Sequence, residues 1–382
     1  KVMQIRICED AEMKKMFLED CCEILDSQRV PITAANRAEG PYPYYGANGV
    51  QDYVADYIFD DELVLLAEDG GNFGSKTKPI AYRVSGKCWV NNHAHVIKPK
   101  NGMDVDFLCY SLMFYNTEGL VNGATRQKLT QATMRKMLIP DLSKEQQLEI
   151  VSQLNRIVEI RNLRLKEIQK LDELVKARFV ELFGDVVLND KHWETQEFSK
   201  VTDSRLGKML DAKRQTGQSS FPYLANANVQ WFRFEVDCLN EMDFNEAEQK
   251  EFALEEGDLL VCEGGEIGRC AIWHNQVQPC FFQKALHRVR CKQGIILPDY
   301  LAWWFKFNCE NNGFTAIEGA KATIAHLPGA KLKKLRVVIP PLSLQNQFAD
   351  FVTQVDKSKA AVQKALDETQ LLFDSLMQEY FG

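Results

Sequence analysis

The chain has 382 residues, 45% of them hydrophobic and 26% charged, and its formal net charge is −7. This length suits two or three domains with a core each, and the composition excludes a disordered or fibrous chain. The eleven cysteines form no CxxC pair, which argues against a zinc site, and their odd number argues against a complete disulfide framework. Free thiols and the absence of a long apolar run predict a cytoplasmic protein.

Residues 1–13 precede a Lys-Lys-Met-Phe stretch that resembles a natural start, so we expect them to be a leader or an appended segment. The first predicted domain covers residues 14–140. Its signals in chain order are a turn-rich segment at 43–51, an apolar strand at 63–67 that runs into glycines, strand-like segments within 88–97 and a short helix at 107–112.

Residues 141–185 are predicted to form a long helix. Ser143 is a suitable N-cap with Gln146 near the capping-box position, and Gly184 follows the last turn. A helix of this length is unusual in a globular core. We therefore interpret it as a spacer.

The second predicted domain, 186–338, repeats the signals of the first in the same order, at 222–230, 259–265, 280–289 and 300–304. The sequence thus predicts one mixed α/β (α+β) domain used twice, an internal repeat with pseudo-twofold symmetry. Similarity is confined to scaffold positions. The stretches between them differ, as expected if each copy recognises something different.

Residues 339–382 form the second predicted long-helix segment. It opens with Ile339-Pro340-Pro341-Leu342-Ser343, which repeats residues 139–143 two hundred positions later. Ser343 is again the expected N-cap. Both helices have a heptad seam, and antiparallel pairing as a coiled coil would bury both seams. Arg161, Asp172, Lys359 and Thr369 interrupt them. The predicted packing residues are Val151, Leu154, Val158, Leu165, Ile168, Val175 and Phe179 in the first helix, and Phe348, Val352, Val355, Val362, Leu366, Phe373 and Leu376 in the second.

Charge is segregated along the chain in both halves. Residues 70–103 and 267–298 contain basic side chains but no acid, whereas acids gather at 52–69 and 235–258. This pattern predicts that one face of each domain meets phosphates, despite the acidic total.

The ordered set of Cys22-Glu23-Ile24-Leu25-Asp26-Ser27, the segment 123–129, the 339–343 motif with Gln347, and the paired helices resembles the specificity subunit of type I restriction–modification systems. The resemblance covers about residues 14–382, and Asp141 departs from it where the second copy has Pro341. It implies two target-recognition domains, each reading half of a split sequence in double-stranded DNA. The helices would form the spacer and dock two methyltransferase subunits and, where one exists, a motor–nuclease subunit.

The resemblance also implies a non-catalytic chain with no cofactor of its own, because S-adenosylmethionine would bind the partner methyltransferases. Amides, acids and basic side chains in the loops are the candidate DNA contacts. They are Asn48, Asn72, Lys76, Asn92, His93, Thr125, Arg126 and Lys128 in the first domain, and Lys213, Arg214, Asn226, Asn228, Glu266, Arg269, Lys284 and Lys321 in the second.

Two alternatives stay open. A coiled-coil scaffold for a multisubunit assembly would share the helices without reading DNA, but it would not need the acid-free blocks. His93 and His95 alternate, so they share one strand face and could hold a metal. No acid or cysteine lies near them in sequence. We therefore favour a structural or DNA-facing role and expect no metal site.

Overall fold

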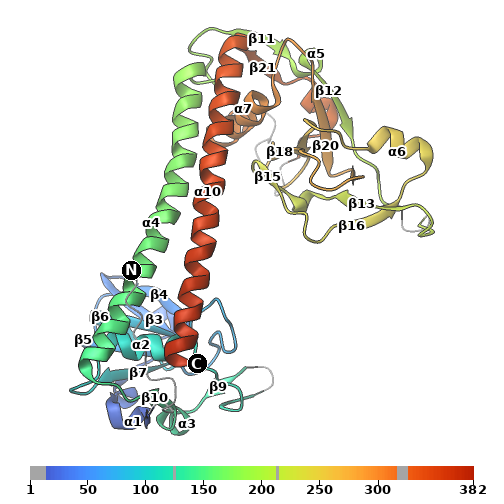
Figure 1. Cartoon of the computed structure of the whole chain (residues 1–382). Helices are drawn as coiled ribbons and strands as arrows, with labels where there is room; N and C mark the ends of the chain where they lie inside the picture. Colours follow the sequence, from blue (N-terminus) through green and yellow to red (C-terminus); the bar gives the residue numbers. More distant parts are fainter. Residues whose placement is uncertain (1–13, 124–125, 212–214, 316–325) are drawn as a thin grey trace, which may run out of the picture. The chain divides into compact units, whose positions relative to one another are not determined.

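The computed structural model describes residues 14–123, 126–211, 215–315 and 326–382. The chain divides into two compact units (Figure 1). Unit 1 comprises Lys1–Leu165 together with Lys364–Gly382, and unit 2 comprises Lys166–Gln363. Among the described residues, no helix combines the length and apolar character needed to span a membrane.

Unit 1 is built on a six-stranded sheet in the order β2-β7-β5-β6-β3-β4. Its central strand carries the apolar run 63–67, which is buried on both faces of the sheet. Helix α2 packs on this sheet, and its N-cap Asp104 accepts hydrogen bonds from the amides of Asp106 and Phe107. The strands are β2 (Cys22–Ile24), β3 (Tyr42–Gly46), β4 (Gly49–Val54), β5 (Phe59–Ala67), β6 (Ala81–Val90) and β7 (Ala94–Pro99), and α2 is Val105–Met113.

Smaller elements complete unit 1. Two short sheets pair β1 with β10 and β8 with β9. The bounds are β1 (Lys15–Phe17), α1 (Leu18–Cys21), β8 (Val121–Asn122), β9 (Lys128–Leu129), α3 (Gln131–Arg135) and β10 (Leu138–Pro140).

Unit 2 repeats this plan with a split sheet, in the orders β12-β20-β17-β18 and β16-β13-β19, plus the pairs β11-β21 and β14-β15. Its strands are β11 (Glu194–Glu197), β12 (Thr202–Leu206), β13 (Ser220–Leu224), β14 (Val229–Gln230), β15 (Arg233–Phe234), β16 (Asn240–Asp243), β17 (Leu259–Cys262), β18 (Cys270–Ile272), β19 (Phe281–Phe282), β20 (Leu286–Cys291) and β21 (Arg336–Ile339). Its helices are α5 (Phe198–Val201), α6 (Glu246–Phe252), α7 (Pro298–Glu310) and α9 (Gly329–Lys333).

The internal repeat extends to strand register. Strand β3 pairs in parallel with β6 through Tyr44 and Trp89, and β13 pairs in parallel with β19 through Tyr223 and Phe281. Likewise, β5 meets β7 with Leu66 opposite His95, and β17 meets β20 with Val261 opposite His287. Each unit is therefore a copy of one scaffold.

The two long helices are α4 (Lys144–Phe183) and α10 (Leu342–Phe381), each of 40 residues. Ser143 caps α4 as predicted, with its hydroxyl 3.4 Å from the Gln146 amide and the Gln146 side chain returning a bond to the Ser143 amide. The N-cap prediction for Ser343 is wrong, because α10 begins at Leu342 and places Ser343 inside its first turn.

A glutamine in the first turn of each helix ties it to its unit. The Gln147 Oε1 atom accepts from the Asp104 amide at 2.7 Å, and the Gln345 Oε1 atom accepts from the Leu297 amide at 2.9 Å. Both glutamines are buried. The residue that corresponds to Gln147 is therefore Gln345, whereas the sequence comparison paired Gln147 with Gln347.

The helices pair antiparallel within each unit (Figure 1). In unit 1 the end of α10 meets the start of α4, where Tyr380 donates to Gln153 at 3.0 Å. In unit 2 the start of α10 meets the end of α4, where the rings of Phe348 and Phe179 lie 5.4 Å apart. The predicted fold class, with two mixed α/β domains and two long antiparallel helices, is confirmed.

One predicted packing position is wrong. Leu165 is 50% exposed, whereas Val151, Leu154, Val175, Phe179, Phe348, Val355 and Phe373 are buried and Val158, Ile168, Val352, Val362, Leu366 and Leu376 are partly buried. The error is one of register. The helix starts (144 and 342) and the helix ends (183 and 381) are both 198 residues apart, so the seam passes through Arg164 rather than Leu165.

The residues that interrupt the predicted seams have partners across the helix pair. Lys359 forms an ion pair with Asp172 in unit 2. In unit 1 the Arg164 guanidinium donates to the Thr369 hydroxyl, and Arg161 donates to Gln370 at 3.4 Å. The polar positions of one helix therefore match those of the other, which fixes how the two are aligned.

Candidate nucleic-acid interface

Four of the predicted DNA contacts of unit 1 lie together beyond the end of strand β5. His93 Nδ1 lies 2.6 Å from Asp69 Oδ1, and Arg126 Nη2 donates to the same oxygen at 2.7 Å. Asn48, in the turn after β3, donates to the carbonyl of Gly70 at 3.1 Å. Lys128 pairs with Glu68 at 3.0 Å. The Arg126 side chain is 59% exposed and Asp69 only 19%, so the acid holds a basic group that faces solvent.

Gly70 allows this close arrangement. Its φ is +63°, a conformation that favours glycine, and its amide donates to the carbonyl of Gln127 at 3.2 Å. A Cβ at this position would lie 3.3 Å from Arg126 Nε. The chain around Arg126 therefore lies directly along the turn that follows β5.

The remaining described candidates of unit 1 are less organised. Asn72 donates to the carbonyl of Pro79 at 3.4 Å and so supports its own loop. Lys76 and Asn92 are exposed. They stay predictions based on sequence.

In unit 2, Arg269 and Asn226 meet at the equivalent turn after β17. Arg269 Nη2 donates to the carbonyl of Asn226 at 3.1 Å, and a Cβ on Gly265 would lie 3.6 Å from Asn226 Nδ2. Within the described residues, Asn226 Oδ1 and Arg269 Nε are buried without a hydrogen-bond partner.

The other unit 2 candidates have different surroundings. The Asn228 side-chain amide supports its own turn, because it accepts from the Ala225 amide at 2.9 Å and donates to the Glu235 carbonyl at 3.0 Å. Glu266 and Lys284 are exposed. Thr125, Lys213, Arg214 and Lys321 lie outside the described residues.

The acid-free blocks do not form continuous phosphate-facing surfaces. Arg83 pairs with Asp106 at 2.5 Å and also with Glu62, and Lys98 pairs with Asp61 at 2.7 Å. The reason is strand pairing, since β5 carries acids and lies between β6 and β7, which carry bases. In unit 2, Arg290 likewise pairs with Asp258 at 2.6 Å. Acidic and basic residues that are separated along the sequence are therefore paired with each other in the fold.

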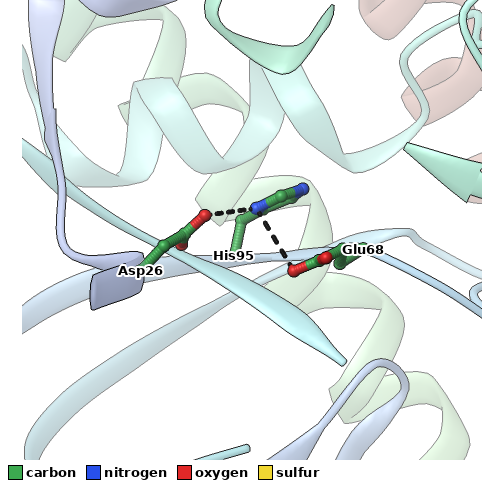
Figure 2. A group of neighbouring side chains, drawn as sticks. All are labelled: Asp26, Glu68 and His95. Carbon is green, nitrogen blue, oxygen red and sulfur yellow. Dashed lines mark hydrogen bonds and ion pairs between the residues drawn. The ribbon is translucent and has the colours of Figure 1, made fainter. Parts of the chain in front are cut away.

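A buried ionic cluster lies beneath the unit 1 site. Figure 2 shows Asp26 and Glu68 pointing toward the same ring nitrogen of His95, with Nδ1 at 2.7 Å from Asp26 Oδ2 and 3.7 Å from Glu68 Oε2. Arg29 donates to Glu68 at 2.6 Å. The pKa of Asp26 is raised by burial but more strongly lowered by its bonds to His95 and the Val96 amide, so it falls below the ordinary value.

Asp26, Glu68 and His95 bring three ligand atoms within 4.8 Å of one another, as a metal site would. However, Arg29 Nη1 lies 2.6 Å from Glu68 Oε2 and Nη2 lies 3.5 Å from Asp26 Oδ2. A divalent cation at this point would meet the guanidinium. The donor set therefore fits the arginine rather than a metal.

Unit 2 has a histidine at the same position without this cluster. Leu206 pairs with His287 across β12 and β20, where Asp26 stands beside His95 in unit 1. Burial lowers the pKa of His287. A hollow of about 890 Å³ opens beside it, lined in part by Leu206, Lys208 and Lys333. The partners Asp26, Glu68 and Asp69 were missed by sequence reasoning, although Asp26 lies within the 22–27 segment that carried the family resemblance.

The sequence model of a family described as the type I restriction modification DNA specificity domain matches residues 10–174 and 190–369. A putative type I restriction enzyme specificity subunit of Haemophilus influenzae is 28% identical, over 98% of this chain and 95% of its own length. A crystal structure of a type I restriction–modification S subunit from M. genitalium has a TM-score of 0.58 at 13% identity, covering 99% of this chain and 98% of the other. A structure described for assembly and conformational transition of a type I system has a TM-score of 0.59 at 14% identity, covering 97% and 99%.

Proposed function

Because the chain belongs to the type I restriction–modification DNA specificity family, we propose that it reads a split target in double-stranded DNA and directs adenine methylation there. Each unit recognises one half of the target. The observation that carries this proposal is the repeat, since one scaffold with the same strand register carries different polar side chains beyond β5 and β17. Two copies of one scaffold with different recognition loops suit a target with two different halves.

The unit 1 site has the chemistry of DNA contact. Arg126 presents a planar guanidinium to solvent, and Arg pairs well with guanine edges and phosphate oxygens. Asn48 and His93 lie beside it on the same support. In unit 2, Asn226 and Arg269 meet at the equivalent turn.

The chain itself is non-catalytic in this proposal and has no cofactor. Two methyltransferase subunits dock on the paired helices α4 and α10 and bring S-adenosylmethionine, and a motor–nuclease subunit joins where the system encodes one. The complex works in the cytoplasm, where the DNA is. These partner assignments follow the family to which the chain belongs.

The test is methylation of host DNA read by single-molecule sequencing. We expect an adenine-methylated motif with two specified halves and an unspecified spacer, lost when the gene is deleted and restored by the intact gene. An unchanged methylation pattern on deletion would contradict the proposal and favour the scaffold alternative.

Arg126 offers a finer test at the level of binding. Each phosphate contact contributes about one unit to the dependence of log K on log salt concentration. Arg126→Gln in the assembled complex should lower that slope by about one if the guanidinium meets a phosphate. Arg233→Gln is the matched control, because Arg233 is an exposed arginine paired with Glu235 and is not among the candidate contacts. A slope unchanged by Arg126→Gln would remove Arg126 from the phosphate contacts.

A further inference from the structure

We propose that His95 and His287 are positioning residues, each holding a leucine beside its unit's candidate DNA contacts through a hydrogen bond from Nε2 to the backbone carbonyl of that leucine. This inference rests on the proposed function. It assigns a role to two buried histidines that do not touch DNA themselves.

The bond is repeated in both units. His95 Nε2 lies 2.9 Å from the carbonyl of Leu129, and His287 Nε2 lies 3.0 Å from the carbonyl of Leu327. Both side chains are almost fully buried, at 0% and 1% exposed. A carbonyl can only accept, so Nε2 carries the proton in both cases.

A second repeated bond holds the same two residues. The Leu129 amide donates to the Glu68 carbonyl at 2.7 Å, and the Leu327 amide donates to the Glu263 carbonyl at 2.6 Å. The backbone at the end of the strand therefore binds the amide of each leucine, and the histidine binds its carbonyl. Both leucines are fully buried. The segment that precedes each leucine thus starts from a fixed point.

The two leucines adjoin the described candidate contacts. Lys128 directly precedes Leu129 and pairs with Glu68, and Arg126, two residues before Lys128, pairs with Asp69. In unit 2, His326 directly precedes Leu327 and bridges to Gly264, the residue after Glu263. Lys321 precedes it in sequence, outside the described residues. Movement of Leu129 would therefore displace Arg126 and Lys128, and movement of Leu327 would disturb the turn after β17, where Asn226 and Arg269 meet.

The surroundings of the second ring nitrogen, Nδ1, differ between the units, so the Nε2 bond is the feature that both units share. In unit 1, Nδ1 faces the carboxylates of Asp26 and Glu68. In unit 2, a Cβ on Gly329 would lie 3.3 Å from the ring carbon Cε1 of His287, and burial lowers the pKa of that imidazole. The two rings thus differ in surroundings but donate to the same backbone position.

Unit 2 gives the cleaner experiment, because no carboxylate takes the place of Asp26 beside His287. His287→Leu fills similar space without a donor, whereas His287→Gln keeps a donor near the Nε2 position. The assembled complex is used, with the full chain and its methyltransferase subunits. Methylation rates are compared on duplexes that carry the cognate target or a single base change in one half, and the matched pair His95→Leu and His95→Gln is measured in parallel.

We expect His287→Leu to reduce discrimination against changes in one half of the target by about tenfold, the order of one lost base contact. Discrimination in the other half should stay within about twofold of wild type. His95→Leu should show the reverse pattern. A residue that only supports the fold would lower methylation without favouring one half, so half-specific loss with rescue by His287→Gln identifies positioning.

Three outcomes would overturn the inference: unchanged discrimination for both leucine variants, equal relaxation of both halves, or a loss in His287→Gln as large as in His287→Leu. Should His287→Leu fail to fold, His287→Gln decides, because a folded glutamine variant without discrimination also contradicts the role. If the wild-type complex methylates no split target, the proposed function fails instead.

Discussion

His95 in unit 1 and His287 in unit 2 stand at the same point of one scaffold, opposite Leu66 and Val261 on the neighbouring strand. Around His95 the chain places Asp26 and Glu68, which both form ion pairs with Arg29. Around His287 it places Leu206 and a hollow. The backbone bonds are constant while the polar neighbours vary.

This difference separates what the scaffold requires from what each copy adds. Both copies keep the bond from histidine to carbonyl, the glutamine that ties the long helix to its unit and the parallel strand pair. The ionic cluster belongs to unit 1 alone, in the part of the chain that the structure describes. Substitutions that give one unit the residue of the other therefore test which of these features the scaffold requires.

The largest effect is expected in the helix cores. Phe179 contacts the rings of Phe183, Tyr300 and Phe348 in unit 2, whereas its counterpart in unit 1 is Met377. Phe179→Ala should destabilise unit 2 by about 4 kcal/mol, and Met377→Ala should destabilise unit 1 by about 2 kcal/mol. Both losses of stability are measured by urea unfolding that is monitored in each unit by hydrogen exchange. Equal losses would mean that the aromatic cluster adds nothing beyond a well-packed methionine.

The next effect concerns the ionic cluster. Asp26→Leu copies Leu206 and leaves Arg29 and His95 without one of their carboxylates, which should cost unit 1 about 3 kcal/mol. Adding Arg29→Met removes one uncompensated charge and should restore part of that loss. The free energy of unfolding, measured for the single and double variants, gives the result. A loss below about 0.5 kcal/mol for Asp26→Leu would show that the cluster is energetically neutral.

His287 in unit 2 and Asp26 in unit 1 predict different pH dependence for the two units. Because burial lowers the pKa of His287 from 6.5, the unfolded chain takes up a proton first as the pH falls below about 6.5. Unit 2 should then lose up to about 1.4 kcal/mol per pH unit. The pKa of Asp26 is lowered from 3.8, so its contribution to unit 1 is present above that pH and lost only below it.

Chemical unfolding between pH 7.5 and 5 measures the slope. His287→Gln should remove the His287 part of it, and the difference between wild type and variant isolates this group from every other titrating residue. An identical slope in both proteins would contradict the assignment of a neutral buried ring.

The smallest effect lies between the helices. The Lys359–Asp172 pair has side chains that are 27% and 59% exposed, so Lys359→Ala should cost about 0.5 kcal/mol and less at high salt. Thr369 in unit 1 is buried and accepts from Arg164, so Thr369→Val should cost about 1 kcal/mol without dependence on salt. Thermal unfolding at two salt concentrations distinguishes them. A reversed order would show that the exposed pair matters more than the buried bond.

Much of the fold follows from the sequence because the repeated signals are local. Apolar strands, Ser143 and the aromatic-glycine ends of the helices are patterns within a few residues. The register of α4 could not be obtained by aligning Val151 with Val352, a shift of 201 residues, because the helices themselves repeat at 198. That difference placed Leu165 on the seam when it is exposed.

The site was less predictable because its partners are distant in sequence. Arg126 and Asp69 are 57 residues apart, and His95 and Asp26 are 69 apart. Acid-free blocks suggested a basic face, yet neighbouring strands neutralise Arg83, Lys98 and Arg290. Asn228 shows the same limit, since its amide is used within its own turn.

Unit 2 is one unbroken stretch of chain, whereas unit 1 needs two stretches that the ribosome synthesises far apart. Phe373, Met377 and Tyr380 are buried in the core of unit 1, although nearly 200 residues are translated between Leu165 and Lys364. The core of unit 1 therefore cannot be completed until residues 364–382 have been translated. During that interval the nascent chain exposes apolar surface that a chaperone would recognise.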